Sequence, residues 1–330
     1  MKYYVGIDIG SVSTNVIAID EDYNLIFDQY IRANGQPLES VKKGMQLMHE
    51  KLGCNDDDIL GIGTTGSGRE LAGILVGADV VKNEITAHAT ATLHYHPDAS
   101  TIFEIGGQDS KIIILQDGMV TDFAMNTVCA AGTGSFLDHQ AERLGIPIED
   151  FGDMALSAER DVRIAGRCTV FAESDMIAKQ QYGFSKAEII KGLCTALVRN
   201  YINNLSRGKT LKPPYIFQGG VAANKGILAA FENEVGHEVI IPEHFNVMGA
   251  IGCAILAKEY IESTGNKPAF KGFDRLDLEF TPTSFECNDC PNMCEVVKVV
   301  SGGETLAVWG DKCGKYAGTS KSRTKKKQKG

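Results

Sequence analysis

The sequence predicts an α/β fold in which two related domains face each other. An acidic residue two positions before a glycine, set between apolar strands, occurs at Asp8 and again 96 residues later at Glu104. The two strings are IDIGSVST at residues 7–14 and FEIGGQDS at residues 103–110, and each leads into an apolar strand, a turn and a third strand. Helical and strand-like periods alternate through the second half, as in α/β proteins. We interpret the repeat as an internal duplication.

The individual elements follow from local patterns of apolar and turn residues. Runs of β-branched and apolar residues predict strands at 3–9, 13–20, 24–31, 59–64, 215–218 and 238–241. Apolar residues at intervals of three and four predict helices at 38–52, 133–144, 186–205, 224–234 and 247–261.

The composition changes after residue 262 and sets the expected boundaries. Glycine and proline interrupt the periodicity there, and six of the last ten residues are Lys or Arg. The expected division is residues 1–102 for the first subdomain, 103–262 for the second, 263–283 for a linker, 284–318 for a small cysteine-rich β-ribbon and 319–330 for a disordered basic tail.

The composition also excludes several classes of protein. The chain has 330 residues, 43% of them hydrophobic, but no apolar run approaching the roughly 18 residues of a membrane span. Asp8 comes too early for a secretory leader, so we expect a cytoplasmic protein with no membrane partner. The net charge is −9, and −15 without the last ten residues, which argues against nucleic-acid binding. Nine cysteines in such a protein favour thiols or metal ligands over disulfides.

Three glycine turns are candidates for binding a nucleotide, at residues 8–14, 104–109 and 219–224. Tight glycine turns let backbone N–H groups approach phosphate oxygens closely, and nearby carboxylates can hold Mg²⁺ through water. The sequence contains neither a P-loop nor a G-x-G-x-x-G string after its first strand. The three turns together resemble the phosphate-1, phosphate-2 and adenosine motifs of the superfamily of acetate and sugar kinases, heat-shock chaperone ATPases and actin.

This resemblance implies duplicated ribonuclease-H-like domains of the actin and sugar-kinase type, hinged around Mg·ATP and covering about residues 3–262. Two cysteines divide the superfamily further. Cys129 precedes a glycine turn and helix, and Cys168 precedes a helix expected to begin near Glu173. A helix N-terminus favours a thiolate through its free N–H groups and dipole. Two thiolates from each chain of a two-fold dimer would complete the four ligands of one [4Fe–4S] cluster.

The alternative for these two cysteines is burial as small hydrophobes, which we expect for Cys54, Cys194 and Cys253. The strings at residues 104–109, 129–136 and 168–174 resemble those of ATP-dependent activators of 2-hydroxyacyl-CoA dehydratases, with related benzoyl-CoA reductase subunits and double-cubane protein reductases. The resemblance implies that Cys129 and Cys168 hold the cluster. It also implies a homodimer that takes an electron from a ferredoxin or flavodoxin and passes it, driven by ATP, to a partner iron–sulfur enzyme.

The same resemblance assigns the nucleotide contacts. Phosphate and Mg²⁺ contacts fall on Ser11, Val12, Ser13, Thr14, Asn15, Gly106, Gly107, Gln108 and Asp109, and contacts to the adenosine end fall on Gly219 and Gly220. We expect Asp8 and Asp109 to position Mg²⁺ and water, and Gln108 to orient the attacking water. Glu104, the duplicate of Asp8, is a weaker candidate.

Four further cysteines lie beyond the region of resemblance. Their spacing, C-x₂-C-x₃-C-x₁₈-C, brackets two strand-like runs at 295–300 and 304–309 that predict a two-stranded ribbon. The expected ligands of a zinc ion or an iron–sulfur cluster are Cys287, Cys290, Cys294 and Cys313. The spacing does not choose between the two metals. Compact dehydratase activators end near residue 262, so this module leaves the identity of the partner enzyme open.

Two other functions remain open at this point. A small-molecule kinase on the same fold would need a carboxylate base, for which Asp138 is the available residue. A chaperone-like ATPase would use the terminal module for docking. His88 is expected to be a core or surface histidine rather than a metal ligand.

Overall fold

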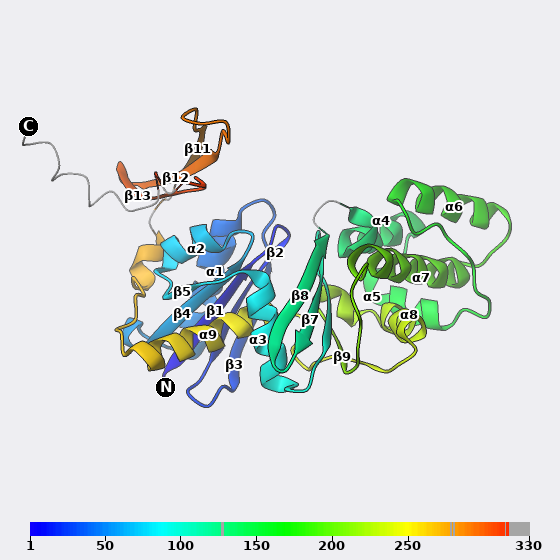
Figure 1. Cartoon of the computed structure of the whole chain (residues 1–330), viewed down its shortest axis with the longest axis horizontal. Helices are drawn as coiled ribbons and strands as arrows, with labels where there is room; N and C mark the ends of the chain where they lie inside the picture. Colours follow the sequence, from blue (N-terminus) through cyan, green and yellow to red (C-terminus); the bar gives the residue numbers. More distant parts are fainter. Residues whose placement is uncertain (127–128, 278, 280, 314, 317–330) are drawn as a thin grey trace, which may run out of the picture.

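Two five-stranded sheets, one in each half of the chain, form the body of the molecule in the computed structural model, which describes residues 1–126, 129–277, 279, 281–313 and 315–316 (Figure 1). The first sheet has the order β3-β2-β1-β4-β5 and the second has the order β10-β9-β6-β7-β8. The first sheet contains β1 (Tyr3–Ile9), β2 (Ser13–Ile19), β3 (Leu25–Arg32), β4 (Ile59–Gly66) and β5 (Val80–Val81). The second contains β6 (Thr101–Ile105), β7 (Ser110–Gln116), β8 (Met119–Asn126), β9 (Tyr215–Gln218) and β10 (Val239–Ile240).

The two sheets repeat one topology. In each sheet, three consecutive strands form an antiparallel meander. The first strand of the meander also pairs in parallel with a later strand, β1 with β4 and β6 with β9. The repeated string therefore occupies the same place in both sheets, at the turn between the first two strands. This is the arrangement expected from an α/β fold with an internal duplication.

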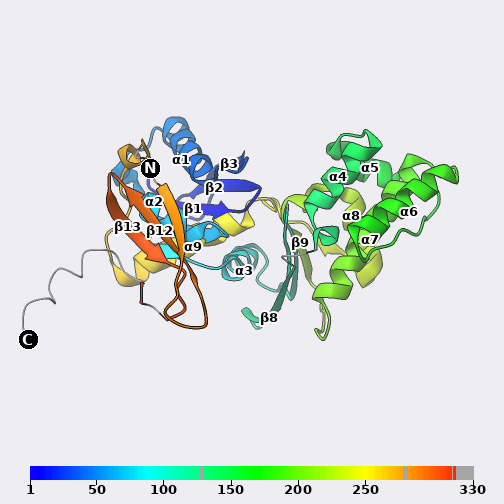
Figure 2. The ribbon, with the colours of Figure 1, turned by 90° about the horizontal axis from the view of Figure 1, so that it is seen from above.

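Helices cover both faces of the first sheet. The helices α1 (Pro37–Leu52) and α2 (Arg69–Val76) bury their apolar side chains against one face of β1 and β2. On the opposite face lie α3 (Glu84–Tyr95) and α9 (Met248–Thr264). The helix α3 also packs on the second sheet, because Ile85 and Ala89 share a core with Ile102 and Ile113. It therefore lies between the two domains (Figure 2).

The outer face of the second sheet is covered by five helices on the right of Figure 1. These are α4 (Gly134–Leu144), α5 (Ile148–Leu156), α6 (Thr169–Gln181), α7 (Lys186–Leu205) and α8 (Lys225–Val235). No helix in the described part of the chain is long and apolar enough to cross a membrane.

The helix α9 crosses back to the first domain. The sequence places it with the second subdomain, 103–262, whereas in the structure it packs on β1, β2 and β4. Glycines in those strands permit the approach. A Cβ atom on Gly6 would lie 1.8 Å from the carbonyl oxygen of Ala250, and one on Gly63 would lie 2.2 Å from that of Cys253. The helix backbone rests directly on the sheet backbone.

The C-terminal region differs from the expectation in two ways. It contains a three-stranded antiparallel sheet of β11 (Thr281–Glu286), β12 (Glu295–Ser301) and β13 (Glu304–Trp309), where the sequence predicted two strands. The expected linker is also partly folded, because Leu276 is buried in the core against α1 and α2, and Phe270 and Phe273 pack around it. The predicted basic tail, 319–330, lies outside the described residues.

We expect Gly6→Ala to destabilise the protein by about 2 kcal/mol or more, because the new methyl group meets a helix carbonyl that cannot move away alone. Gly61→Ala is the matched control on the same sheet. Its Cβ would meet the side chains of Tyr4 and Ile261 at 3.1 Å, so a loss of about 1 kcal/mol or less is expected. Urea unfolding of the three proteins measures the difference. Equal losses would contradict this account of the α9 contact.

Candidate functional site

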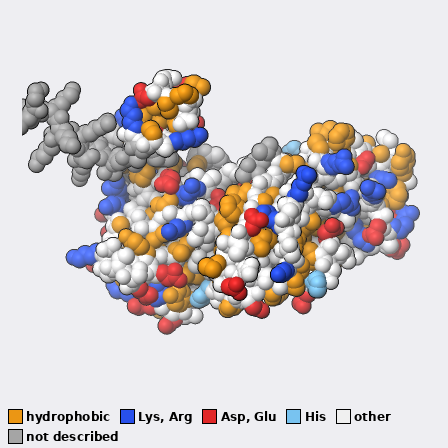
Figure 3. Space-filling view, in the orientation of Figure 1, with side chains coloured by type: hydrophobic (Ala, Val, Ile, Leu, Met, Phe, Trp, Pro, Cys, Tyr) orange, Lys and Arg blue, Asp and Glu red, His pale blue; other side chains and the backbone are white. Residues whose placement is uncertain are grey.

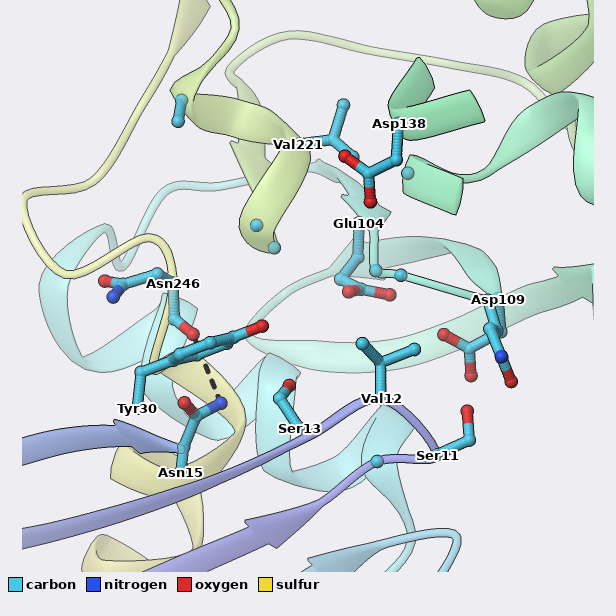
Figure 4. A pocket seen from close by; sticks show the side chains of 18 of the residues that line it. Ser11, Val12, Ser13, Asn15, Tyr30, Glu104, Asp109, Asp138, Val221 and Asn246 are labelled. Atoms are coloured by element: carbon cyan, nitrogen blue, oxygen red, sulfur yellow. Dashed lines mark hydrogen bonds between the residues drawn. The ribbon is translucent and has the colours of Figure 1, made fainter. Parts of the chain in front are cut away.

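A cavity of about 650 Å³ opens between the two domains, where the two repeated turns face each other (Figure 4). In Figure 4, Ser11 and Asp109 lie on opposing turns, one from each domain. The cavity brings together the predicted residues Asp8, Ser11, Val12, Ser13, Asn15, Gly106, Gly107, Gln108, Asp109, Gly219 and Gly220. The strand ends of both sheets thus supply one site.

Thr14 is the predicted contact residue that does not line this cavity. Its side chain is fully buried, and its hydroxyl lies 2.6 Å from the hydroxyl of Ser40 on α1. Side chains alternate between the two faces of a strand, so Ser13 and Asn15 face the cavity while Thr14 faces the helix. The resemblance alone could not resolve this alternation.

Four carboxylates surround one lysine on the floor of the cavity. The ammonium of Lys111 lies 2.7 Å from Glu84, 2.9 Å from Glu104 and 3.0 Å from Asp109. Asp8 is the fourth carboxylate and interacts electrostatically with this group. The sequence analysis missed Lys111 and Glu84. A charged residue at the start of the apolar run IIIL was the available signal for Lys111.

The protonation of this cluster reflects its burial. Burial raises the pKa of Asp8 to about 7, and the Glu84 carboxylate adds to the effect. Burial also raises the pKa of Glu104 to about 7, against the opposing charge of Lys111. Burial alone would lower the pKa of Lys111, but the three carboxylates raise it above its ordinary value. Carboxylates are among the groups that interact with Mg²⁺ in proteins, directly or through bound water.

His88 is a third residue whose place at the cavity the sequence did not indicate. It is buried, lines the cavity, and its Nδ1 lies 2.9 Å from the side-chain nitrogen of Gln218. The Gln218 oxygen in turn accepts a hydrogen bond of 3.1 Å from the hydroxyl of Thr92. Burial lowers the pKa of His88 to about 3, so the ring is neutral near pH 7. It is a core histidine, as expected, but one placed at the cavity.

The third glycine turn is tied to the second. Gly219 has a φ of +89°, and a Cβ atom there would lie 2.4 Å from the carbonyl oxygen of Ile105 and 2.7 Å from a carboxylate oxygen of Glu104. Only glycine fits this position without strain. Asn224 then caps α8 by accepting hydrogen bonds of 3.0 and 3.1 Å from the first turn of the helix. The turn at Gly219 is thus held against the phosphate-2 strand.

The two candidate cluster cysteines lie on neighbouring loops. Both are half-buried, and each immediately precedes a helical segment, Cys129 before η2 (Ala130–Gly132) and Cys168 before α6. The helix after Cys168 begins at Thr169, earlier than the expected Glu173, so the cysteine is its N-cap residue. Cys129 and Cys168 carry no disulfide.

The side chains of two asparagines form hydrogen bonds with the backbone of these loops. The side chain of Asn126 binds both the backbone N–H and the carbonyl of Cys129, at 2.9 and 2.7 Å. Asn200 of α7 donates to the carbonyl of Gly166, two residues before Cys168. Its oxygen also lies close to Gly132, where a Cβ atom would be 3.1 Å away. The two cysteine loops therefore meet at Asn200.

Large apolar side chains are exposed around Cys168. On α6, Val170 is 63% exposed, Phe171 64% and Ile177 44%. Figure 3 shows hydrophobic side chains gathered at the end of the second domain that carries α4 and α6. Exposed apolar groups that gather in this way mark surfaces that other proteins cover.

The remaining cysteines fall into two groups. Cys54, Cys194 and Cys253 are buried, as expected, and burial raises the pKa of Cys194 to about 12. The other four belong to the C-terminal sheet: Cys287, Cys290 and Cys294 occupy the β11–β12 connection, and Cys313 follows β13. Among the described residues, no three His, Cys, Asp or Glu side chains are arranged to hold a metal ion.

The comparisons with known proteins show the family of this chain. A family model described as the BadF/BadG/BcrA/BcrD ATPase family matches residues 5–257. The chain belongs to this family. It is 32% identical over 259 residues to the (R)-2-hydroxyglutaryl-CoA dehydratase activating ATPase of Acidaminococcus fermentans, covering 77% of this chain and 96% of that protein. It is also 32% identical to the activator of lactoyl-CoA dehydratase of Anaerotignum propionicum, covering 78% of this chain and 98% of that protein.

A solved structure of a family relative resembles the whole two-domain body. The activator of the 2-hydroxyisocaproyl-CoA dehydratase from Clostridium difficile, with bound ADPNP, superposes with a TM-score of 0.74 at 30% identity. The match covers 80% of this chain and 97% of that one. The actin and sugar-kinase-like fold expected from the glycine turns is therefore confirmed for the body.

We expect Asp8→Asn to stabilise the nucleotide-free protein, by on the order of 1–3 kcal/mol at pH 8 and by less at pH 5. The carboxyl has a pKa of about 7 in the folded protein and about 3.9 unfolded, so the folded state binds more protons between these values. Stability therefore falls as the pH rises from 4 to 7, and the amide removes that loss. Calorimetry at both pH values measures it, with exposed Asp98→Asn as control. Equal gains at both values would contradict the shifted pKa.

Proposed function

We propose that this chain hydrolyses ATP to drive one electron from a [4Fe–4S] cluster, shared between two copies of the chain, into a partner iron–sulfur enzyme. The observation that carries the proposal is a direct connection between the phosphate-2 turn and the segment after Cys129. The backbone N–H of Gly134 donates to the carbonyl of Gly106 at 2.9 Å, and that of Ser135 donates to the carbonyl of Gly107 at 2.8 Å. Any movement of the turn around a phosphate reaches the first residues of α4.

Cys129 and Cys168 of each copy would hold the cluster, which supplies one-electron chemistry when bound. Cys168 is the N-cap residue of α6, so the free N–H groups of the first helical turn lie beside it and would interact favourably with an anionic cluster. The exposed apolar side chains of α6 would be covered by the second copy or by the partner enzyme. Asn126 and Asn200 would keep the two loops at a constant separation within one chain.

Carboxylates and other residues that line the cavity would bind the nucleotide and carry out its hydrolysis. Asp8 and Asp109 would hold Mg²⁺, directly or through water, and Gln108 would orient the water that attacks the terminal phosphate. Glycine turns at Gly106 and Gly219 would bind the phosphates and the adenosine end. ATP must bind more tightly to the state that docks the partner, since equal affinity for both states would shift neither.

The names of the relatives support a partner of the 2-hydroxyacyl-CoA dehydratase or benzoyl-CoA reductase type. A double-cubane protein is the third candidate from the sequence resemblance. A ferredoxin or flavodoxin would reduce the cluster. These assignments rest on the family and extend the ATP-dependent activation that its members share.

The small-molecule kinase remains the second candidate because of one observation. Asp138 does line the cavity, where Figure 4 shows it near Val221. A glucokinase of the ROK family shares the fold with a TM-score of 0.50, but at 13% identity this shows the fold alone. Transfer of phosphate from ATP to a sugar, in place of simple hydrolysis, would favour this reading.

Protein prepared and reconstituted without oxygen is expected to contain about four iron atoms per dimer that depend on Cys129 and Cys168. Cys129→Ser and Cys168→Ser should each lose this iron and the ability to activate a dehydratase, while basal ATP hydrolysis continues. Cys54→Ala, at a buried position far from both loops in the sequence, is the control and should keep the iron. No iron in the reconstituted wild-type protein would overturn the electron-transfer proposal.

We also propose that Cys287, Cys290, Cys294 and Cys313 bind a zinc ion or an iron–sulfur cluster. Among the described side chains of the surrounding sheet, the buried apolar ones are chiefly Val296 and Val299, and β11 is exposed along its whole length. A module of this size is rarely stable without a structural metal site or disulfides. An ion pair between Lys315 and Asp289 keeps the chain after Cys313 beside the β11–β12 connection.

Metal analysis of the Cys129→Ser protein, which lacks the shared cluster, isolates this second site. We expect about one zinc, or about four irons, per chain, and loss of either in the double variant Cys129→Ser/Cys290→Ser. Cys129→Ser/Cys54→Ala is the matched control. Equal metal contents in the two double variants would remove the C-terminal cysteines as ligands.

A further inference from the structure

Lys111 is a buried cation that lines the cavity between the two domains. Its side chain is 3% exposed and lies at the start of β7, directly after the phosphate-2 turn. The ammonium has three N–H donors, and three carboxylates lie within 3.0 Å of it. These three carboxylates therefore use all of its hydrogen-bonding capacity.

Its three partners are not equivalent. Glu104 pairs with Lys111 across β6 and β7, and Asp109 lies in the turn between these two strands, so both belong to the same domain as Lys111. Glu84 is the first residue of α3, which packs mainly on α9 of the first domain. The pair between Lys111 and Glu84 is thus the one that joins the two domains across the cleft.

The charge of the cavity indicates what could replace one of these partners. Its lining contains the carboxylates of Asp8, Glu84, Glu104, Asp109, Asp138 and Glu149. The basic residues in the lining are Lys111 and Arg32, and Arg32 lies on β3 rather than at the phosphate turns. Among the residues that the structure describes, an anionic triphosphate placed between the two turns therefore meets one fixed positive charge, the ammonium of Lys111.

We infer that Lys111 binds the terminal phosphate of ATP and gives up its contact with Glu84 to do so. This inference rests on the proposed ATP-binding function and specifies which phosphate the Lys111 ammonium binds. The exchange of one carboxylate oxygen for one phosphate oxygen leaves the ammonium with three acceptors. It also releases the cross-domain pair only when the terminal phosphate is present. ADP would leave the pair with Glu84 intact.

The test compares the affinities for ATP and ADP, measured by calorimetry in the presence of Mg²⁺. Lys111→Met is expected to weaken ATP binding by about ten-fold or more and ADP binding by less than about three-fold. Glu84→Gln is expected to strengthen ATP binding a few-fold, because the competing carboxylate is gone. Lys258→Met is the matched control: this lysine is also buried, but it pairs with Glu262 on α9 and does not line the cavity.

A purely structural role for Lys111 would weaken ATP and ADP equally, and that result would overturn the inference. If Lys111→Met does not fold, Lys111→Met/Glu104→Gln removes one charge of each sign, and the same fall in the ATP-to-ADP affinity ratio is expected. An unchanged ratio in that double variant would equally overturn it. If the wild-type protein binds neither nucleotide, the proposed function itself fails. If the wild-type protein binds ATP and the variants leave its ATP-to-ADP affinity ratio unchanged, only the inference about Lys111 fails.

Discussion

The hydrogen bonds from the start of α4 to the carbonyls of Gly106 and Gly107 are the contacts on which the rest of the site depends. They make the phosphate-2 turn and the segment after Cys129 one continuous unit. Hydrogen bonds tolerate only a narrow range of lengths and angles. A shift of about a few tenths of an ångström at the turn would therefore displace the start of the helix as well. Under the proposed function, a phosphate bound at this turn would be linked to the segment after Cys129 by these two backbone hydrogen bonds.

The polar face of α3 provides a second connection between the domains. Glu84, His88 and Thr92 are spaced four residues apart and therefore lie on one side of the helix. Each of them contacts a side chain of the second domain, either Lys111 or Gln218. Apolar residues of the same helix pack on both sheets. Under the proposed function, this helix would transmit a change at the phosphates to the contact between the two domains.

Electrostatics would support the response to a ligand that the proposed function requires. Buried carboxylates with raised pKa values cost folding free energy, which the fold recovers only in part through Lys111. Mg²⁺ and a nucleotide would relieve that cost when they bind. Functional sites often keep unfavourable interactions of this kind, because they are removed by the ligand and so add to its effect on the equilibrium.

The sequence by itself determined the local elements and the chemistry that they carry. The strands around the repeated turns, the helix 186–205 and the positions of Cys129 and Cys168 before helices follow from period, propensity and spacing. Only the tertiary structure decided which distant residues meet: that α9 returns to Gly6, and that Thr92 reaches Gln218, 126 positions away. A local pattern reports the face that a residue occupies but not the partner placed against it, because that partner depends on how whole elements pack.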